Sequence, residues 1–64
     1  MRHNKDANAP DPAEVLEARK LASLTQPDAA AKVYVTLRTW QNYESGTCPM
    51  HPGLWELFQI KTRM

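Results

Sequence analysis

Apolar residues recur every three or four positions along much of this chain, which is the spacing of one face of an α-helix. Val15, Ala18 and Ala22 follow this spacing. Asp11 and Pro12 come just before them, and an N-cap acid followed by proline is typical of a helix start. The pattern therefore predicts a first helix that begins after Asp11.

Two threonines mark the starts of two further short helices. Thr25 has Asp28 three residues further on, and an alanine-rich run follows. Thr36 precedes a run that stops at Gly46, and glycine favours helix ends. The sequence therefore predicts a short helix, a turn, and a second helix over about residues 36–45.

Pro52 begins the last predicted helix, whose apolar residues cover more than one face. These residues are Leu54, Trp55, Leu57, Phe58 and Ile60. So wide a stripe exceeds what the core of a small domain needs, and we expect a dimer interface at Leu54, Trp55 and Phe58. The alternative is that residues 13–45 of the same chain cover the whole stripe.

The first ten residues are polar, lack apolar periodicity and end in proline. We expect a flexible N-terminal arm over residues 1–10 and one domain over residues 11–64. Every predicted element is a helix. The expected fold class is therefore all-α, a compact four-helix domain with no sheet.

Composition narrows the classes of protein to consider. The 64 residues are 42% apolar and 23% charged, which is ordinary for a soluble domain. No run approaches the roughly 18 apolar residues of a membrane span, and no apolar signal segment follows the first residues. Cys48 is the only cysteine, which excludes an intrachain disulfide. We therefore expect a cytoplasmic protein with no membrane association.

Cys48 and His51 have the spacing of a pair of metal ligands. Two ligands do not make a zinc site, and His3 in a loose arm is a poor third. Cys48 also has no positioned base that would make it a nucleophile. We expect no metal, no cofactor, no catalytic residue and no enzymatic activity, and no small-molecule ligand is evident.

The two middle helices are the most informative feature of the sequence. A short helix, a turn and a second helix with a polar outer face form the helix-turn-helix of DNA-binding proteins, in which the second helix enters the major groove. Trp40 and Tyr43 lie three residues apart and are expected to face the core rather than stack on bases. Arg38, Gln41 and Asn42 point elsewhere, and such side chains make bidentate contacts to guanine or adenine.

The order of residues in this region resembles the lambda-repressor-like (Cro/Xre-type) helix-turn-helix family. The matching residues are Leu24-Thr25-Gln26, Ala30, Val35-Thr36, Trp40, Tyr43-Glu44 and Gly46. The ending, with Pro49-Met50, Pro52 and Leu54-Trp55, looks most like the short phage-encoded anti-CRISPR-associated repressors, which switch off their own operons. The resemblance covers roughly residues 13–61 and implies a DNA-binding transcriptional repressor.

The resemblance also implies roles for individual residues. The base-facing positions are Leu37, Arg38, Gln41 and Asn42. The positions that would contact the DNA backbone are Thr25, Gln26, Thr36 and Thr39. A structural ion pair would join Arg19 and Glu44.

Three residues depart from the pattern of the family. Leu37 replaces a polar residue, so it would either contact a thymine methyl or have no role. Ser23 and Tyr34 stand where the family often has glycine. A positive φ at either residue would cost on the order of 1 kcal/mol.

These observations lead us to expect a homodimeric, autoregulatory repressor that binds double-stranded DNA at an inverted repeat, with half-sites roughly 34 Å apart. Eight basic and seven acidic residues give a net charge of +1, so nonspecific binding should be weak. Arg2 and Lys5 of the arm would follow the DNA backbone or the minor groove, or have no role. The alternative function is an antitoxin-like or other protein-interaction module that masks a partner protein. RNA binding is less favoured, because the A-form major groove is too narrow for a helix.

Overall fold

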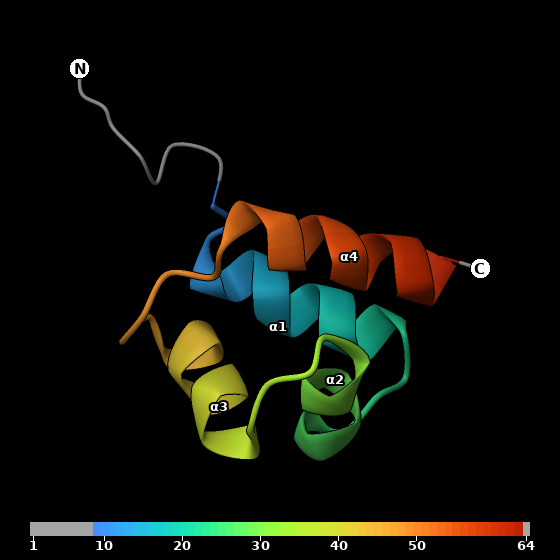
Figure 1. The fold of residues 1–64 in the computed structure, drawn as a ribbon, viewed down its shortest axis with the longest axis horizontal. Helices are drawn as coiled ribbons and strands as arrows, with labels where there is room; N and C mark the ends of the chain where they lie inside the picture. Colours follow the sequence, from blue (N-terminus) through green and yellow to red (C-terminus); the bar gives the residue numbers. More distant parts are fainter. Residues whose placement is uncertain (1–8, 64) are drawn as a thin grey trace.

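The computed structural model describes residues 9–63, which form four helices joined by short loops (Figure 1). The helices are α1 (Pro12–Leu21), α2 (Gln26–Lys32), α3 (Leu37–Ser45) and α4 (Pro52–Arg63). Residues 9–63 contain no strand, so the predicted all-α fold of four helices is confirmed. In Figure 1, α4 lies along the top beside α1, and α2 and α3 lie below α1. None of the helices in this range has the length and apolar character needed to cross a bilayer.

The first three helices begin at the residues predicted to cap them. Asp11 precedes α1 in an extended conformation. Thr25 Oγ1 accepts a hydrogen bond from Asp28 N at 3.3 Å at the start of α2. Thr36 Oγ1 accepts one from Thr39 N at 3.1 Å at the start of α3. Each threonine satisfies an amide that has no partner within its helix, which contributes about 1 kcal/mol.

Three residues in the left-handed conformation end α1, α2 and α3. Gly46 has a φ of 86°, as expected of the glycine that stops α3. Ser23 and Tyr34 have φ values of 60° and 63°, although glycine is the residue that adopts this conformation without strain. After Ser23 and after Tyr34, the backbone N–H of the next residue donates a hydrogen bond to the carbonyl oxygen five residues earlier in the chain. This bond is typical of the Schellman motif at the end of a helix. These bonds run from Leu24 N to Arg19 O at 3.1 Å and from Val35 N to Ala30 O at 3.0 Å.

The core is built around two aromatic side chains with no exposed surface, Trp40 of α3 and Phe58 of α4. Their ring centroids lie 5.0 Å apart, and Tyr43 packs edge-on against Trp40 with centroids 6.0 Å apart. The other buried apolar residues are Val15, Ala29, Ala30, Val33 and Met50. The small side chains of α2 let that helix pack closely on α3. The inward placement predicted for Trp40 and Tyr43 is therefore confirmed.

The apolar stripe of α4 is mostly covered by the chain's own core. Phe58 is 0% exposed, so it has no surface to offer a second copy, and its prediction as a dimer-interface residue is wrong. Leu54, Trp55 and Leu57 are partly buried against the same core. Ile60, at 48%, is the one large apolar residue of α4 that is more than one-third exposed. Periodicity identified the apolar face of α4 correctly, but the chain's own core covers more of it than expected.

The start of the packed domain lies slightly earlier than predicted. Residues 1–8, with Arg2 and Lys5, lie outside the described residues. Pro10 is buried and lines the same pocket as Tyr43 and Met50. The predicted boundary between the arm and the domain therefore moves to before Pro10.

Candidate nucleic-acid interface

The outer face of α3 presents four polar side chains on one side of the helix. Arg38, Gln41 and Ser45 are exposed, and Asn42 is partly exposed. Trp40, on the opposite side, anchors the helix in the core. Positions 38, 41, 42 and 45 share one face because three to four residues make one helical turn. The structure thus brings together the three polar side chains that the sequence indicated for base contact.

Glu44 lies at the junction of α1, α2 and α3, with a side chain only 8% exposed. Arg19 donates from Nε to Glu44 Oε2 at 2.6 Å and from Nη2 to Oε1 at 3.3 Å. Gln26 Nε2 donates to Oε1 at 2.9 Å, and Trp40 Nε1 donates to Oε2. The expected pair of Arg19 with Glu44 is therefore present. With Gln26 and Trp40, it joins three helices at one carboxylate.

The ionised form of Glu44 is favoured in the folded protein. Burial by itself raises the pKa of this carboxyl group. The hydrogen bonds from Arg19, Gln26 and Trp40, together with the positive charge of Arg19, outweigh burial and hold the pKa of Glu44 below its usual value. The carboxylate therefore stays charged and keeps its four hydrogen bonds near neutral pH.

Gln26 connects Glu44 to the outer face of α3. Because its Nε2 donates to Glu44, its Oε1 faces Gln41 and accepts a hydrogen bond from Gln41 Nε2 at 3.4 Å. Gln41 therefore keeps one N–H donor and its Oε1 acceptor for an outside partner. The major-groove edge of adenine offers the complementary N7 acceptor and N6 donor. This relay of side chains fixes the orientation of both amides.

Two threonines shape the first turn of α3. Thr36 Oγ1 donates to Thr39 Oγ1 at 2.9 Å and accepts from Thr39 N. The hydroxyl hydrogen of Thr39 therefore remains for an outside acceptor. Leu37, 41% exposed, lies on the same turn. Thr25 is exposed at the start of α2, and Gln26 follows it, so the expected backbone-contacting residues lie at the first turns of α2 and α3.

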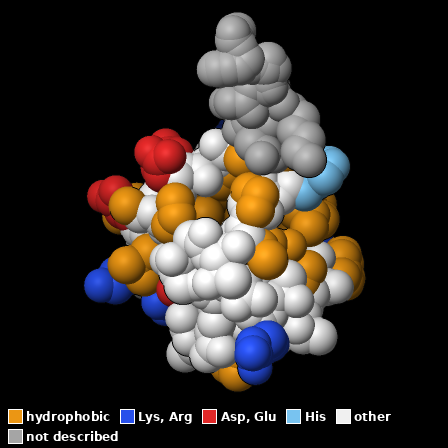
Figure 2. Space-filling view, turned by 90° about the vertical axis from the view of Figure 1, so that its left-hand side faces the viewer, with side chains coloured by type: hydrophobic (Ala, Val, Ile, Leu, Met, Phe, Trp, Pro, Cys, Tyr) orange, Lys and Arg blue, Asp and Glu red, His pale blue; other side chains and the backbone are white. Residues whose placement is uncertain are grey.

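The charges around the outer face of α3 favour the binding of a polyanion such as DNA only weakly. The first turn of α3 has no acidic residue, whereas Glu14 and Asp28 occupy the first turns of α1 and α2. Figure 2 shows this side of the molecule; its lower part, where α3 lies in Figure 1, is mostly uncharged, with a Lys or Arg side chain at its lower edge. The most prominent acidic side chains lie at the upper left. A phosphate that approaches the start of α3 therefore meets the positive end of the helix dipole without an opposing carboxylate.

Lys61 of α4 holds the turn between α2 and α3, a contact that the sequence did not predict. Its Nζ donates to Tyr34 Oη at 2.7 Å and to Lys32 O at 2.8 Å, and lies 4.1 Å from the centroid of the Tyr34 ring. The hydrogen bond from Lys61 and its charge lower the pKa of Tyr34. Lys61 is 27 residues from Tyr34 in sequence, so helical spacing gives no sign of the contact.

Cys48 and His51 both form hydrogen bonds in the loop that precedes α4. His51 Nδ1 accepts a hydrogen bond from Gly53 N at 2.9 Å, which caps the first turn of α4. Cys48 is exposed, and its amide donates to Asn42 O at 3.3 Å. Over residues 9–63, no three His, Cys, Asp or Glu side chains come together in a group that could hold a metal ion.

Comparison with known proteins assigns no family: no protein-family model matches this sequence, and no curated protein matches it. The functional assignment therefore rests on the residues of α2 and α3 and on their geometry.

Proposed function

We propose that this chain is a sequence-specific double-stranded DNA-binding protein that places α3 in the major groove. The observation that carries the proposal is the outer face of α3, where Arg38, Gln41 and Asn42 lie on one side of a helix anchored by Trp40. A helix that reads bases needs hydrogen-bonding side chains outward and a fixed angle to the domain. Trp40 and the Glu44 junction supply that fixed angle.

Each of the four residues proposed to meet the bases has a distinct role in the proposed complex. Arg38 donates two hydrogen bonds to the O6 and N7 atoms of guanine. Gln41, whose amide orientation is set by Gln26, pairs with adenine. Asn42 contacts a neighbouring base, and Leu37 meets a thymine methyl. The recognised sequence therefore includes a guanine and an adenine close together in one half-site.

The DNA backbone is held at the first turns of α2 and α3. Thr39 donates its free hydroxyl hydrogen to a phosphate, and the amides at the start of α3 face the same region. Thr25 and Gln26 contact a phosphate from the start of α2. Phosphate contacts fix the register of a protein on DNA, and base contacts supply specificity.

The proposed biological role is transcriptional repression. A protein that occupies promoter DNA as a dimer on an inverted repeat blocks transcription by its presence alone. The resemblance of the residues of α2 and α3 to Cro/Xre-type repressors supports this role. The C-terminal part of the chain, with Pro49-Met50, Pro52 and Leu54-Trp55, resembles anti-CRISPR-associated repressors. On this basis we extend the proposal to autoregulation of a phage or mobile-element operon.

The direct test is selection of binding sites from a random pool of double-stranded DNA with the full chain. The proposal predicts enrichment of an inverted repeat whose half-sites contain guanine and adenine. The same selection with Arg38→Ala should lose the guanine. Failure of the wild-type chain to enrich any motif would contradict the proposal.

A further inference from the structure

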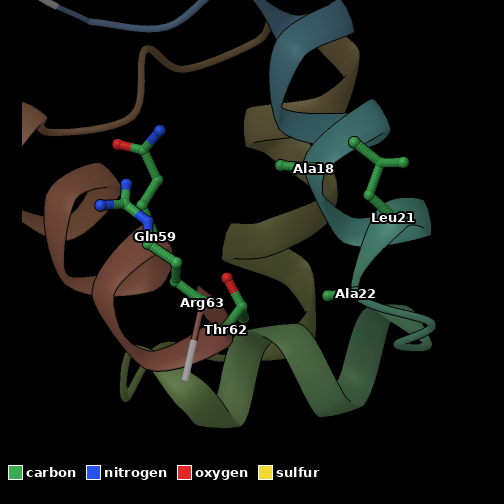
Figure 3. A pocket seen from close by; sticks show the side chains of 6 residues that line it. All are labelled: Ala18, Leu21, Ala22, Gln59, Thr62 and Arg63. Carbon is green, nitrogen blue, oxygen red and sulfur yellow. The ribbon is translucent and has the colours of Figure 1, made fainter.

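An open groove runs between α1 and α4, on residues that have no part in the proposed contact with DNA. Figure 3 shows one part of it, with side chains of α1 on one side and of α4 on the other. The side chains that line this part are Ala18, Leu21, Ala22, Gln59, Thr62 and Arg63. The groove continues along the same two helices towards Glu14, Glu17 and Trp55, because Ala18, Leu21 and Gln59 line both parts.

Leu21 is the most exposed large apolar residue of the described chain, at 80%. It lies beside Ala18 on α1. The small side chains of Ala18 and Ala22 leave space along this wall of the groove. The groove thus combines a projecting leucine with a shallow recess that has alanines on its α1 wall and Gln59, Thr62 and Arg63 on its α4 wall. One exposed leucine is ordinary on a protein surface. Here the exposed leucine lies beside a recess, so the same surface offers both a projecting side chain and a place that can receive one.

The two ends of the groove carry opposite charges. Helices α1 and α4 run in the same direction (Figure 1), so Glu14 and Glu17 lie at one end and Arg63 lies at the other. A two-fold axis through the groove would reverse a second copy, so that its Arg63 faces the glutamates of the first copy and its glutamates face the first Arg63. The charges are therefore self-complementary.

We infer that the α1–α4 groove binds a second copy of this chain in an antiparallel, two-fold arrangement. Leu21, which lines both parts of the groove, lies near the axis and inserts between the alanines of the partner and its α4. Glu17 and Arg63 pair across the interface at both ends. The surface differs from the one that the apolar stripe of α4 suggested, because Phe58 is buried and Leu21 is exposed.

A second copy is the occupant that this surface fits best. A heterologous partner would need its own acid-and-base pattern to match, whereas the groove already matches itself under a two-fold axis. The small core is a further argument, because a domain of this size buries only about 60% of its unfolded surface and gains stability by burying more against a partner. The inference does not rest on the DNA-binding role of α3.

The first test is the association state of the full chain without DNA, measured by sedimentation equilibrium up to about 1 mM, where even a weak interface associates. We expect a reversible dimer that Leu21→Gln weakens by about tenfold or more. The matched control is Ile60→Gln, which changes an exposed apolar residue of α4 outside the groove. A wild-type chain that stays monomeric, or a dimer weakened as much by Ile60→Gln as by Leu21→Gln, would overturn the inference.

The second test is a charge exchange at the ends of the groove. Glu17→Arg alone and Arg63→Glu alone each place like charges opposite one another and should weaken the dimer. The double variant restores opposite charges and should recover most of the association. Loss of association in the double variant equal to the sum of the two single losses would refute the antiparallel pairing. Circular dichroism of each variant checks that the helices remain folded.

Discussion

The side-chain amide of Gln26 in α2 donates a hydrogen bond to Glu44 of α3 over 2.9 Å. This bond decides which way the Gln26 amide points, and so which atom it offers to Gln41. A partly buried carboxylate thereby controls an exposed side chain of the proposed DNA interface. The consequence can be measured as an energetic coupling between α2 and α3.

Gln26 and Gln41 should act as a unit in DNA binding. In a double-mutant cycle on a selected binding site, Gln26→Ala and Gln41→Ala should be non-additive by about 0.5–3 kcal/mol, because either change breaks the same relay. The control cycle pairs Gln26→Ala with Arg38→Ala, for which no hydrogen bond connects the side chains in the described structure, and should be additive. Additive effects in the first cycle would show that the relay does not orient Gln41.

Glu44 should stabilise the fold above its ordinary pKa and lose that effect in acid. Because the pKa of Glu44 is lowered in the folded protein, its contribution is complete above the ordinary pKa of the unfolded chain and is lost as the pH falls through the lower, folded value. Glu44→Gln should therefore be less stable than wild type by about 1.5–3 kcal/mol at pH 7, and the difference should shrink in acid. Urea unfolding of both proteins between about pH 7 and pH 3 measures it. A difference that does not change with pH would contradict the role of the charge.

Ser23→Gly should stabilise the protein by about 0.5–1 kcal/mol, because glycine adopts a positive φ without the strain that serine carries. Thermal unfolding measures the effect, with Ser23→Ala as the control that keeps a β-carbon and should bring no gain. Tyr34 is a less clean site for the same exchange, since Tyr34→Gly also removes the contact with Lys61. Equal stabilities of Ser23→Gly and Ser23→Ala would argue against strain at this turn.

Phe58→Ala should act on folding rather than on association alone. The side chain is fully buried against Trp40, so its truncation should cost about 3–5 kcal/mol of the free energy of unfolding. Phe58→Leu removes less volume and keeps the protein measurable if the alanine variant unfolds. Ile60→Ala, on the exposed side of α4, should change the stability little. An unchanged unfolding transition for both Phe58 variants would contradict the central place of Phe58 in the core.

Local signals in the sequence were sufficient to predict the four helices and to predict which side chains of α3 face the core. Thr25 and Thr36 cap helices because their hydroxyls reach amides three residues away, which is a purely local geometry. Gly46 ends α3 because it adopts a positive φ freely. Trp40 and Tyr43 face inward because their spacing places them on one side of a helix.

Contacts between distant segments could not be predicted in the same way. The apolar stripe of α4 was visible, but periodicity does not say which surface covers it, and Phe58 lies in the chain's own core. Met50 is buried although it lies in a loop. The hydrogen bond of Lys61 to Tyr34 depends on the angle between α4 and α2, which no local pattern fixes. The Arg19–Glu44 pair was expected only through the resemblance to a family.

Base reading by Arg38 of α3 can be measured as the affinity for a selected duplex relative to a scrambled one at a fixed, near-physiological salt concentration. Fluorescence anisotropy with wild type, Arg38→Ala and the control Lys20→Ala, an exposed cation of α1, gives this ratio for each protein. We expect Arg38→Ala to lose about 1–3 kcal/mol of discrimination with unchanged helical content, whereas Lys20→Ala should keep the wild-type ratio. An Arg38→Ala protein that is folded and still discriminates as well as wild type would show that Arg38 does not read the bases.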